Sequence, residues 1–227
     1  RILVLGDSFV WGFGVDDDEI FTRELEQRLA SRPRPWEVIN TGVSGWGNDQ
    51  QLLFLIEEGL AYEPDIVVLS FFFINDPINN SEAVQYGFNK PVFLNHQLEL
   101  GNIPVPKPGE KPAELKLPES PWEITLAIMK GMSDVCREND CRLVIMKFGV
   151  FALPDNPDVR ERDRKWNQDV ARLSGIDYLD LDAEFTARGL AEKDLTSKVI
   201  DRHWTPAGHE IIAKLLHEFL EEKQLIQ

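Results

Sequence analysis

Five short aliphatic runs, separated by stretches with helical spacing, constrain this chain of 227 residues more than any other feature. The runs cover residues 2–5, 38–39, 66–73, 143–148 and 178–181. Between them, apolar residues recur every three or four positions, as at Phe21, Leu25 and Leu29, which is the period of a helix with one buried face. This alternation predicts a parallel sheet with helices on both faces. The length suits one core, so we expect residues 1–227 to form a single domain.

Small polar residues or glycines follow three of these runs. Ser8 comes soon after the first run, Gly45 after the second and Asn75 after the third. Right-handed crossovers place the carboxyl ends of parallel strands at one edge of a sheet, so these three positions meet there. Open α/β sheets build their ligand sites at that edge. The sequence therefore predicts a site around Ser8, Gly45 and Asn75.

Four motifs carry a resemblance to a known family. In chain order they are Gly6-Asp7-Ser8-Phe9, Asn40-Thr41-Gly42-Val43-Ser44-Gly45, Asn75-Asp76 and Asp201-Arg202-His203. Their residues and their order resemble the motif blocks of the SGNH (GDSL-type) hydrolases, over nearly the whole chain. The resemblance implies a flavodoxin-like three-layer α/β/α sandwich with a five-stranded parallel sheet. It also implies a serine esterase that uses no cofactor.

The resemblance assigns a role to each motif. Ser8 would be the nucleophile, His203 the general base and Asp201 the residue that orients His203. The backbone N–H groups of Ser8 and Gly45 and the side-chain amide of Asn75 would form the oxyanion hole, with Gly42 as the rival of Gly45. Acyl transfer needs these four parts: a nucleophile, a base, an orienting group and oxyanion donors. Asp7 is better explained as a hydrogen-bond acceptor for the backbone of the nucleophile loop.

The last motif departs from the usual pattern. Its Asp and His are normally separated by two residues, whereas only Arg202 separates Asp201 from His203, and Trp204 follows. In an extended segment residues two apart point to the same side at about 6.6 Å, which lets a carboxylate meet an imidazole. We therefore expect an extended backbone here, with Asp182 or no acid as the alternative. This D-x-H-W variant resembles that of relatives acting on cell-surface polysaccharides.

Three tryptophans lie within three positions of these site residues: Trp11, Trp46 and Trp204. A tryptophan offers a large apolar surface with one hydrogen-bond donor, which suits sugar or acyl groups as well as core packing. We interpret them as candidate substrate-binding residues, at least one of which lines a cleft.

A long insertion interrupts the alternation at about residues 77–121. It is rich in proline, carries no convincing helical spacing, and contains two apolar runs around residues 95–97 that suggest a hairpin. Segments of this length inside a compact domain are usually lids, binding loops or linkers. Since it follows Asn75 directly, we expect it to shape the substrate site, with a structural flap as the alternative.

Composition excludes some partners and leaves others open. A formal net charge of −15 disfavours nucleic acid, and no apolar run is long enough to span a membrane. The four histidines are not clustered with other ligands, so no metal site is predicted. The two cysteines, Cys136 and Cys141, leave the redox compartment, and a bond between them, open. The oligomeric state is also open.

The predicted function is hydrolysis of a carboxylic ester through an acyl-enzyme. The substrate would be a small-molecule or carbohydrate ester, most simply one with an O-acetyl or short acyl group. The alternatives are a lysophospholipase or thioesterase, a non-catalytic module that binds acylated glycans, and acyl transfer instead of hydrolysis. The compartment is unknown; the family resemblance slightly favours an extracytoplasmic one, with any signal or anchor upstream of Arg1.

Overall fold

The computed structural model describes residues 1–112, 114–118, 120–150, 153 and 155–226. Its central sheet has five parallel strands in the order β2-β1-β3-β8-β9. The strands are β1 (Ile2–Leu5), β2 (Val38–Asn40), β3 (Ile66–Phe72), β8 (Arg142–Phe148) and β9 (Ile176–Asp180). These strands coincide with the five aliphatic runs, within two residues at each end.

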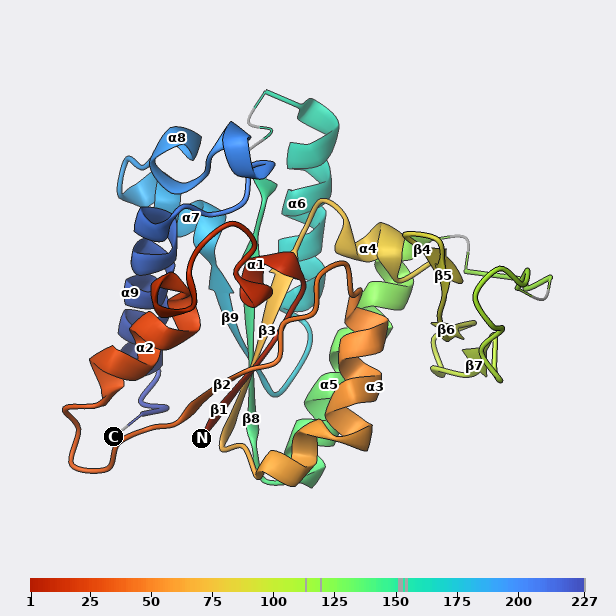
Figure 1. Cartoon of the computed structure of the whole chain (residues 1–227), viewed down its shortest axis with the longest axis horizontal. Coiled ribbons are helices and arrows are strands. Elements are labelled where there is room, and N and C mark those ends of the chain that lie inside the picture. Colours follow the sequence, from red (N-terminus) through yellow and green to blue (C-terminus); the bar gives the residue numbers. More distant parts are fainter. Residues whose placement is uncertain (113, 119, 151–152, 154, 227) are drawn as a thin grey trace.

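Helices cover both faces of the sheet (Figure 1). One face carries α2 (Phe21–Leu29), α7 (Leu181–Ala187) and α9 (Pro206–Glu222). The other carries α3 (Asn48–Glu57), α5 (Pro121–Glu138) and α6 (Pro157–Val170). The architecture is the three-layer α/β/α sandwich expected from the sequence.

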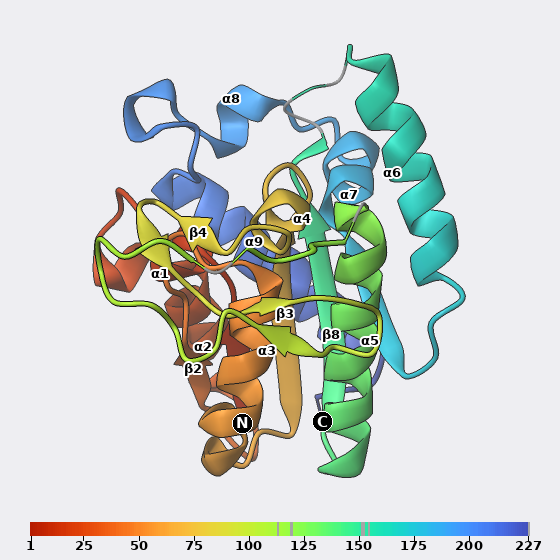
Figure 2. The ribbon, with the colours of Figure 1, turned by 90° about the vertical axis from the view of Figure 1, so that its right-hand side faces the viewer.

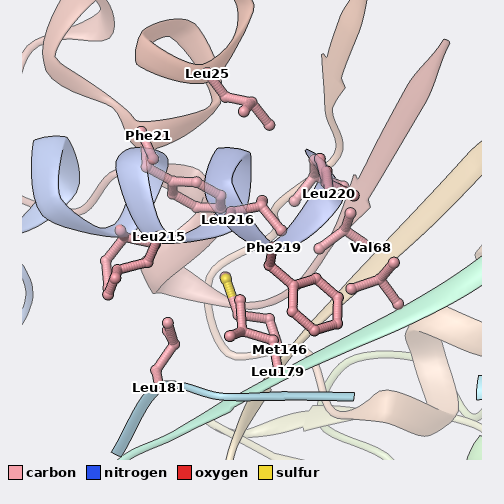
Figure 3. Close-up of a cluster of buried hydrophobic side chains, with 14 of the residues drawn as sticks. Phe21, Leu25, Val68, Met146, Leu179, Leu181, Leu215, Leu216, Phe219 and Leu220 are labelled. Carbon is pink, nitrogen blue, oxygen red and sulfur yellow. The ribbon is translucent and has the colours of Figure 1, made fainter. Parts of the chain in front are cut away.

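Strand β3 shows why the core divides into two parts. Ile66 and Val68 pack under α2 and α9, whereas Val67, Leu69 and Phe71 pack under α3, α5 and α6. Successive side chains of a strand point to opposite faces, so a strand covered on both sides is apolar at nearly every position, with Ser70 as the exception in β3. Figure 3 shows the first part, in which Leu215, Leu216, Phe219 and Leu220 of α9 face the sheet residues Val68 and Met146.

Helix α6 was not predicted from the sequence, and its composition explains why. It is strongly charged, and of its residues only Trp166 and Val170 are buried. Such a helix has no continuous apolar stripe to reveal its period. Its start is nevertheless marked by Asn156, whose side chain accepts hydrogen bonds from the backbone N–H groups of Asp158 and Val159, and by Pro157.

The insertion lies on the side of the molecule that carries α3 and α5 (Figures 1 and 2). The expectation that it holds no helix is wrong at its start, because α4 (Asp76–Asn79) forms one turn there. The expected hairpin is present as β6 (Val92–Phe93) and β7 (Leu100–Gly101). A second hairpin, β4 (Val84–Gln85) with β5 (Phe88–Asn89), was not predicted. Residues 113 and 119 of the insertion lie outside the described part.

Two further sequence questions are answered by the structure. Cys136 and Cys141 are both buried and are free thiols, so they are not bonded to each other here. In the part of the chain that is described, no helix is both long and apolar enough to cross a membrane.

Candidate active site

Ser8 lies at the carboxyl edge of the sheet, where β1 turns into the short helix α1 (Ser8–Trp11). Asp7 is the N-cap of that helix and is buried, and its side chain accepts a hydrogen bond from the N–H of Phe9 at 3.0 Å. An Asp at this position satisfies one of the backbone donors that a helix start leaves open. Asp7 therefore holds the loop that presents Ser8.

His203 reaches Ser8 from a segment 195 positions further along the chain. Its Nε2 lies 2.7 Å from the Ser8 Oγ, and its Nδ1 lies 3.1 Å from the backbone carbonyl of Ile200. If the hydroxyl donates to Nε2, the proton of the neutral ring is on Nδ1 and is donated to that carbonyl. The ring also stacks on Phe9, with centroids 4.4 Å apart. These contacts fix both the orientation and the tautomer that a general base needs.

Asp201 does not occupy the position expected of it. Asp201 and Arg202 both have left-handed backbone conformations, with φ of 51° and 59°, so the expected extended backbone is wrong. The cause is a tight turn in which Arg202 N–H donates to the Ser197 carbonyl at 2.8 Å and His203 N–H to the Ile200 carbonyl at 3.0 Å. The Asp201 side chain is exposed and makes no hydrogen bond within the described residues. The Ile200 carbonyl lies beside His203 Nδ1, where the Asp201 carboxylate was expected.

The alternative acid, Asp182, lies elsewhere. Its carboxylate is 3.0 Å from the ammonium group of buried Lys147, and it accepts a hydrogen bond from the N–H of Gly149 at 3.2 Å. Lys147 also contacts Asp163 at 2.7 Å and Asp180 at 2.9 Å. A fully buried ammonium needs such partners, so this cluster is explained by the burial of Lys147.

The three expected oxyanion donors come from the segments that follow β1, β2 and β3. The N–H groups of Ser8 and Gly45 donate to no acceptor within the described residues, whereas that of Gly42 donates to the Asn40 side chain at 2.9 Å. Because the N–H of Gly42 is already hydrogen-bonded to Asn40, Gly45 is the better candidate for the oxyanion donor. Asn75 lines the same cavity as Ser8 and His203, and Gly45 lines a neighbouring cavity.

A buried pair of carboxyl groups lies behind these loops. The Asp76 side chain accepts hydrogen bonds from Asn48 Nδ2 at 3.0 Å and from the N–H of Phe72 at 2.9 Å. Burial raises the pKa of Asp7 to about 6, and burial together with the charge of Asp7 raises the pKa of Asp76 well above its usual value. Two close carboxylates resist ionising together, so burial and mutual repulsion both favour the protonated form in this pair.

The cavity beside Ser8 has a volume of about 400 Å³ and a largely apolar wall. Phe72, Ile74, Phe148 and Leu153 line it together with Ser8. No group of three or more His, Cys, Asp or Glu side chains in the described part of the chain is arranged to hold a metal ion. The site therefore offers a hydroxyl activated by an imidazole next to a pocket that suits an apolar group.

The three candidate tryptophans have three different environments. Trp204 is completely buried among Phe9, Phe21 and Phe148, although its edge borders the Ser8 cavity. Trp46 lines the neighbouring cavity. Trp11 is 53% exposed and borders neither cavity. Among the described residues, Tyr86 alone lines both cavities, and it was not predicted from the sequence because its hairpin was not.

A parallel α/β sheet with a hydrogen-bonded serine and histidine at its carboxyl edge is the arrangement of a serine hydrolase. The chain belongs to the GDSL-like Lipase/Acylhydrolase family, whose model matches residues 4–211. It is thus a GDSL-type esterase, as the motif resemblance implied. No curated protein sequence is significantly similar to it.

Solved structures of esterases share the fold. The crystal structure of TesA has a TM-score of 0.64 at 17% identity, with 99% of each chain covered. Axe2, an acetylxylan esterase from Geobacillus stearothermophilus, has a TM-score of 0.62 at 16% identity, covering 96% of this chain and 93% of Axe2. The lipase/acylhydrolase from Enterococcus faecalis has a TM-score of 0.60 at 18% identity, covering 98% and 96%.

Proposed function

We propose that this esterase removes an acetyl or other short acyl group from a carbohydrate or small-molecule alcohol, through an acyl-enzyme on Ser8. The observation that carries the proposal is the 2.7 Å contact between Ser8 Oγ and His203 Nε2 at the edge of an apolar cavity. A serine is a weak nucleophile until a base is within hydrogen-bond reach of its proton. The acetylxylan esterase and the lipolytic proteins with this fold are consistent with ester substrates of several kinds.

The reaction proceeds in two halves. Ser8 Oγ attacks the ester carbonyl while its proton moves to His203 Nε2, and the oxyanion accepts hydrogen bonds from Ser8, Gly45 and Asn75. The ester C–O bond then breaks, and Nε2 returns the proton to the leaving alcohol. In the second half a water molecule gives a proton to Nε2 and attacks the acyl-Ser8 carbonyl. Collapse of that intermediate releases the carboxylic acid and restores the Ser8 hydroxyl.

In this scheme the Ile200 carbonyl, in place of a carboxylate, orients the His203 ring. It accepts a hydrogen bond from Nδ1–H, which keeps the proton on Nδ1 and leaves Nε2 free to act as the base. A carbonyl is a neutral dipole, so it stabilises the imidazolium less than a carboxylate would. The mechanism therefore depends on a serine and histidine pair with a main-chain partner.

The test is hydrolysis of p-nitrophenyl esters of increasing acyl length by the wild type and by Ser8→Ala. We expect the highest kcat/KM for acetate or butyrate, a single acyl group on Ser8 by mass spectrometry after rapid quenching, and no turnover by Ser8→Ala. A strong preference for long chains would indicate a lysophospholipase or thioesterase. Binding of acylated sugars without turnover would indicate a binding module, and transfer to a second alcohol faster than acid release would indicate an acyltransferase.

A further inference from the structure

A second cavity of about 400 Å³ lies next to the one that holds Ser8. Its nine lining residues come from the loop around Gly45, the first turn of α3, and the insertion hairpin β4–β5 with the residue that follows it: Ser44, Gly45, Trp46, Gln50, Gln85, Tyr86, Phe88, Asn89 and Lys90. Tyr86 also lines the Ser8 cavity. We call this second cavity the hairpin pocket. It is within the size range of small-molecule sites.

Tyr86 stands at the junction of the two cavities and packs on the loop that supplies an oxyanion donor. A Cβ added to Gly45 would lie 2.5 Å from the Tyr86 ring, so the ring covers the Gly45 α-carbon. The neighbouring Gln85 side chain donates a hydrogen bond to the Gly45 carbonyl. The hairpin therefore borders the route by which a substrate larger than the ester group would leave the Ser8 cavity.

In the turn of this hairpin, Tyr86 has a left-handed backbone conformation that is unfavourable for a bulky aromatic residue. Tyr86 and Gly87, between the paired Gln85 and Phe88, have φ of 49° and 82°, which is the pattern of a tight two-residue hairpin turn. Asn or Gly is preferred at the first position, and a bulky aromatic residue is uncommon there. The Tyr86 side chain is nevertheless 74% exposed, so burial does not offset the strain. Strain at an exposed aromatic residue beside a reactive serine points to a binding role.

The chemistry of the hairpin pocket differs from that of the Ser8 cavity. Its nine residues include three aromatic side chains and three amide side chains, with no Val, Leu or Ile. An acyl chain would favour an aliphatic wall, whereas a sugar ring presents C–H faces that pack on aromatic rings and hydroxyl groups that bond to amides. Gln50, Gln85 and Asn89 bring amide groups to the wall of the pocket, and an amide can both donate to and accept from a sugar hydroxyl group.

The charge of the pocket selects among sugars. Its single cationic residue, Lys90, is buried and paired with the buried carboxylate of Asp49. The pocket thus offers an anion no uncompensated positive charge among its nine lining residues, and the chain as a whole carries a formal charge of −15. A neutral sugar is favoured over a uronate or a phosphorylated sugar.

We propose that the hairpin pocket binds a neutral sugar residue of an oligosaccharide, whose adjoining residue presents its ester to Ser8. The inference rests on the proposed function. It adds that the substrate is an oligosaccharide, with the esterified sugar residue at the Ser8 cavity and the adjoining residue in the hairpin pocket, on either side of Tyr86. Phe88, which is 66% exposed and lines the hairpin pocket but not the Ser8 cavity, is the residue of choice for testing this recognition apart from the catalytic groups.

The first experiment measures binding without turnover. Isothermal titration of Ser8→Ala protein with unacetylated xylo-, manno-, cello- and chitotetraose tests for the site, and oligogalacturonate serves as the charged comparison. We expect at least one neutral tetrasaccharide to bind to the Ser8→Ala protein. Its affinity should be at least tenfold lower for the double variant Ser8→Ala/Phe88→Ala and unchanged for Ser8→Ala/Tyr62→Ala. Tyr62 is a matched exposed aromatic residue before β3, at the opposite end of the sheet. Absence of binding by all four, equal binding by the Phe88 variant, or preference for oligogalacturonate overturns the proposal.

The second experiment measures selectivity. For the wild type, Phe88→Ala and Tyr62→Ala, kcat/KM is compared between acetylated forms of the bound tetrasaccharide and p-nitrophenyl acetate. We expect Phe88→Ala to lower the ratio of the two values about tenfold and Tyr62→Ala to leave it unchanged; an unchanged ratio in Phe88→Ala overturns the proposal. If the tetrasaccharide binds but no ester is hydrolysed, the proposed function fails and the sugar site stands. If p-nitrophenyl acetate is hydrolysed but no tetrasaccharide binds, the sugar site fails and the esterase stands.

Discussion

The serine and the histidine of this site are held in place by different means. On the serine side, side chains hold the backbone: Asp7 accepts from the N–H of Phe9, and Asp76 accepts from the N–H of Phe72. The Asn40 side chain bridges this region, donating to the Val10 carbonyl at 2.7 Å and accepting from the N–H of Gly42. Asp7 and Asp76 are buried.

On the histidine side, hydrogen bonds between backbone groups fix the segment. The residues from Ser197 to His203 are joined by backbone hydrogen bonds, and the imidazole is bonded to a backbone carbonyl. Asp201 and Arg202 have left-handed backbone conformations, are exposed, and line the rim of the Ser8 cavity, where the Arg202 guanidinium lies 3.8 Å from the Glu192 carboxylate. A backbone hydrogen bond survives most side-chain substitutions, whereas a side-chain hydrogen bond does not. Substitutions that keep the fold should therefore have large effects around Ser8 and small ones around His203, apart from His203 itself.

The largest effect is expected where the two regions meet. Ser8→Ala and His203→Ala should each lower kcat by about 10⁴-fold or more, because each removes one partner of the proton transfer. The double variant should be scarcely worse than either single one. Hydrolysis of p-nitrophenyl acetate by folded protein checks this, with Tyr62→Ala as the control. Near wild-type turnover by Ser8→Ala would show that neither region holds the reacting groups proposed here.

The next effect tests the serine side alone. Asn75→Ala should lower kcat by about 10²- to 10³-fold with little change in KM, which is the usual loss on removing one oxyanion donor. Steady-state kinetics on the same ester separates the two constants. A loss confined to KM would mean that Asn75 binds the ground state of the substrate instead.

A third effect concerns stability and the buried carboxyl pair. The folded-state pKa of Asp7, about 6, is above its ordinary value of 3.8, so folding disfavours the ionised form and the free energy of unfolding falls as pH rises from about 4 to 6. Asp7→Asn removes that cost, and its side-chain oxygen still caps the N–H of Phe9. The variant should be more stable than wild type by about 1 to 3 kcal/mol above pH 6, with the gain absent below pH 4.

Urea unfolding at pH 4, 5, 6 and 7 measures the Asp7 effect, with Asp18→Asn as an exposed control. A gain that is the same at every pH would show that the carboxyl group of Asp7 does not carry it. A loss at pH 7 would show that the ionised side chain is needed for the serine side.

Sequence patterns predicted the sheet and missed the elements that lack a pattern. The three inner strands, β1, β3 and β8, are recognisable because they are buried along nearly their whole length. The edge strands β2 and β9 have one buried residue each, and their apolar runs were correspondingly short. Helix α6 is charged along most of its length, and each strand of the β4–β5 hairpin is only two residues long. Neither carries a hydrophobic period, so both depend on tertiary contacts that spacing does not encode.

The active site was likewise predicted only in part from the sequence. The strand pattern placed Ser8 at the carboxyl edge of the sheet and the family resemblance paired it with His203, and the structure brings these two side chains into contact. The spacing of Asp201 and His203 is compatible with an extended segment and also with a turn. The choice is made by the Ser197 carbonyl, which accepts the N–H of Arg202 and closes the turn. A backbone partner leaves no mark on residue identity, so the Ile200 carbonyl could not be read from the sequence.

The smallest effect is expected at Asp201. Its carboxylate makes no hydrogen bond within the described residues, and asparagine tolerates its left-handed backbone, so Asp201→Asn should keep the fold. The change should lower kcat less than about tenfold, or about 1.4 kcal/mol in the barrier, because the Ile200 carbonyl continues to hold Nδ1. An orienting carboxylate would instead cost about 10⁴-fold on the same replacement. Measuring kcat for Asp201→Asn beside exposed Asp194→Asn decides between the two, and a loss near the larger value would mean that the turn opens during catalysis to bring Asp201 to His203.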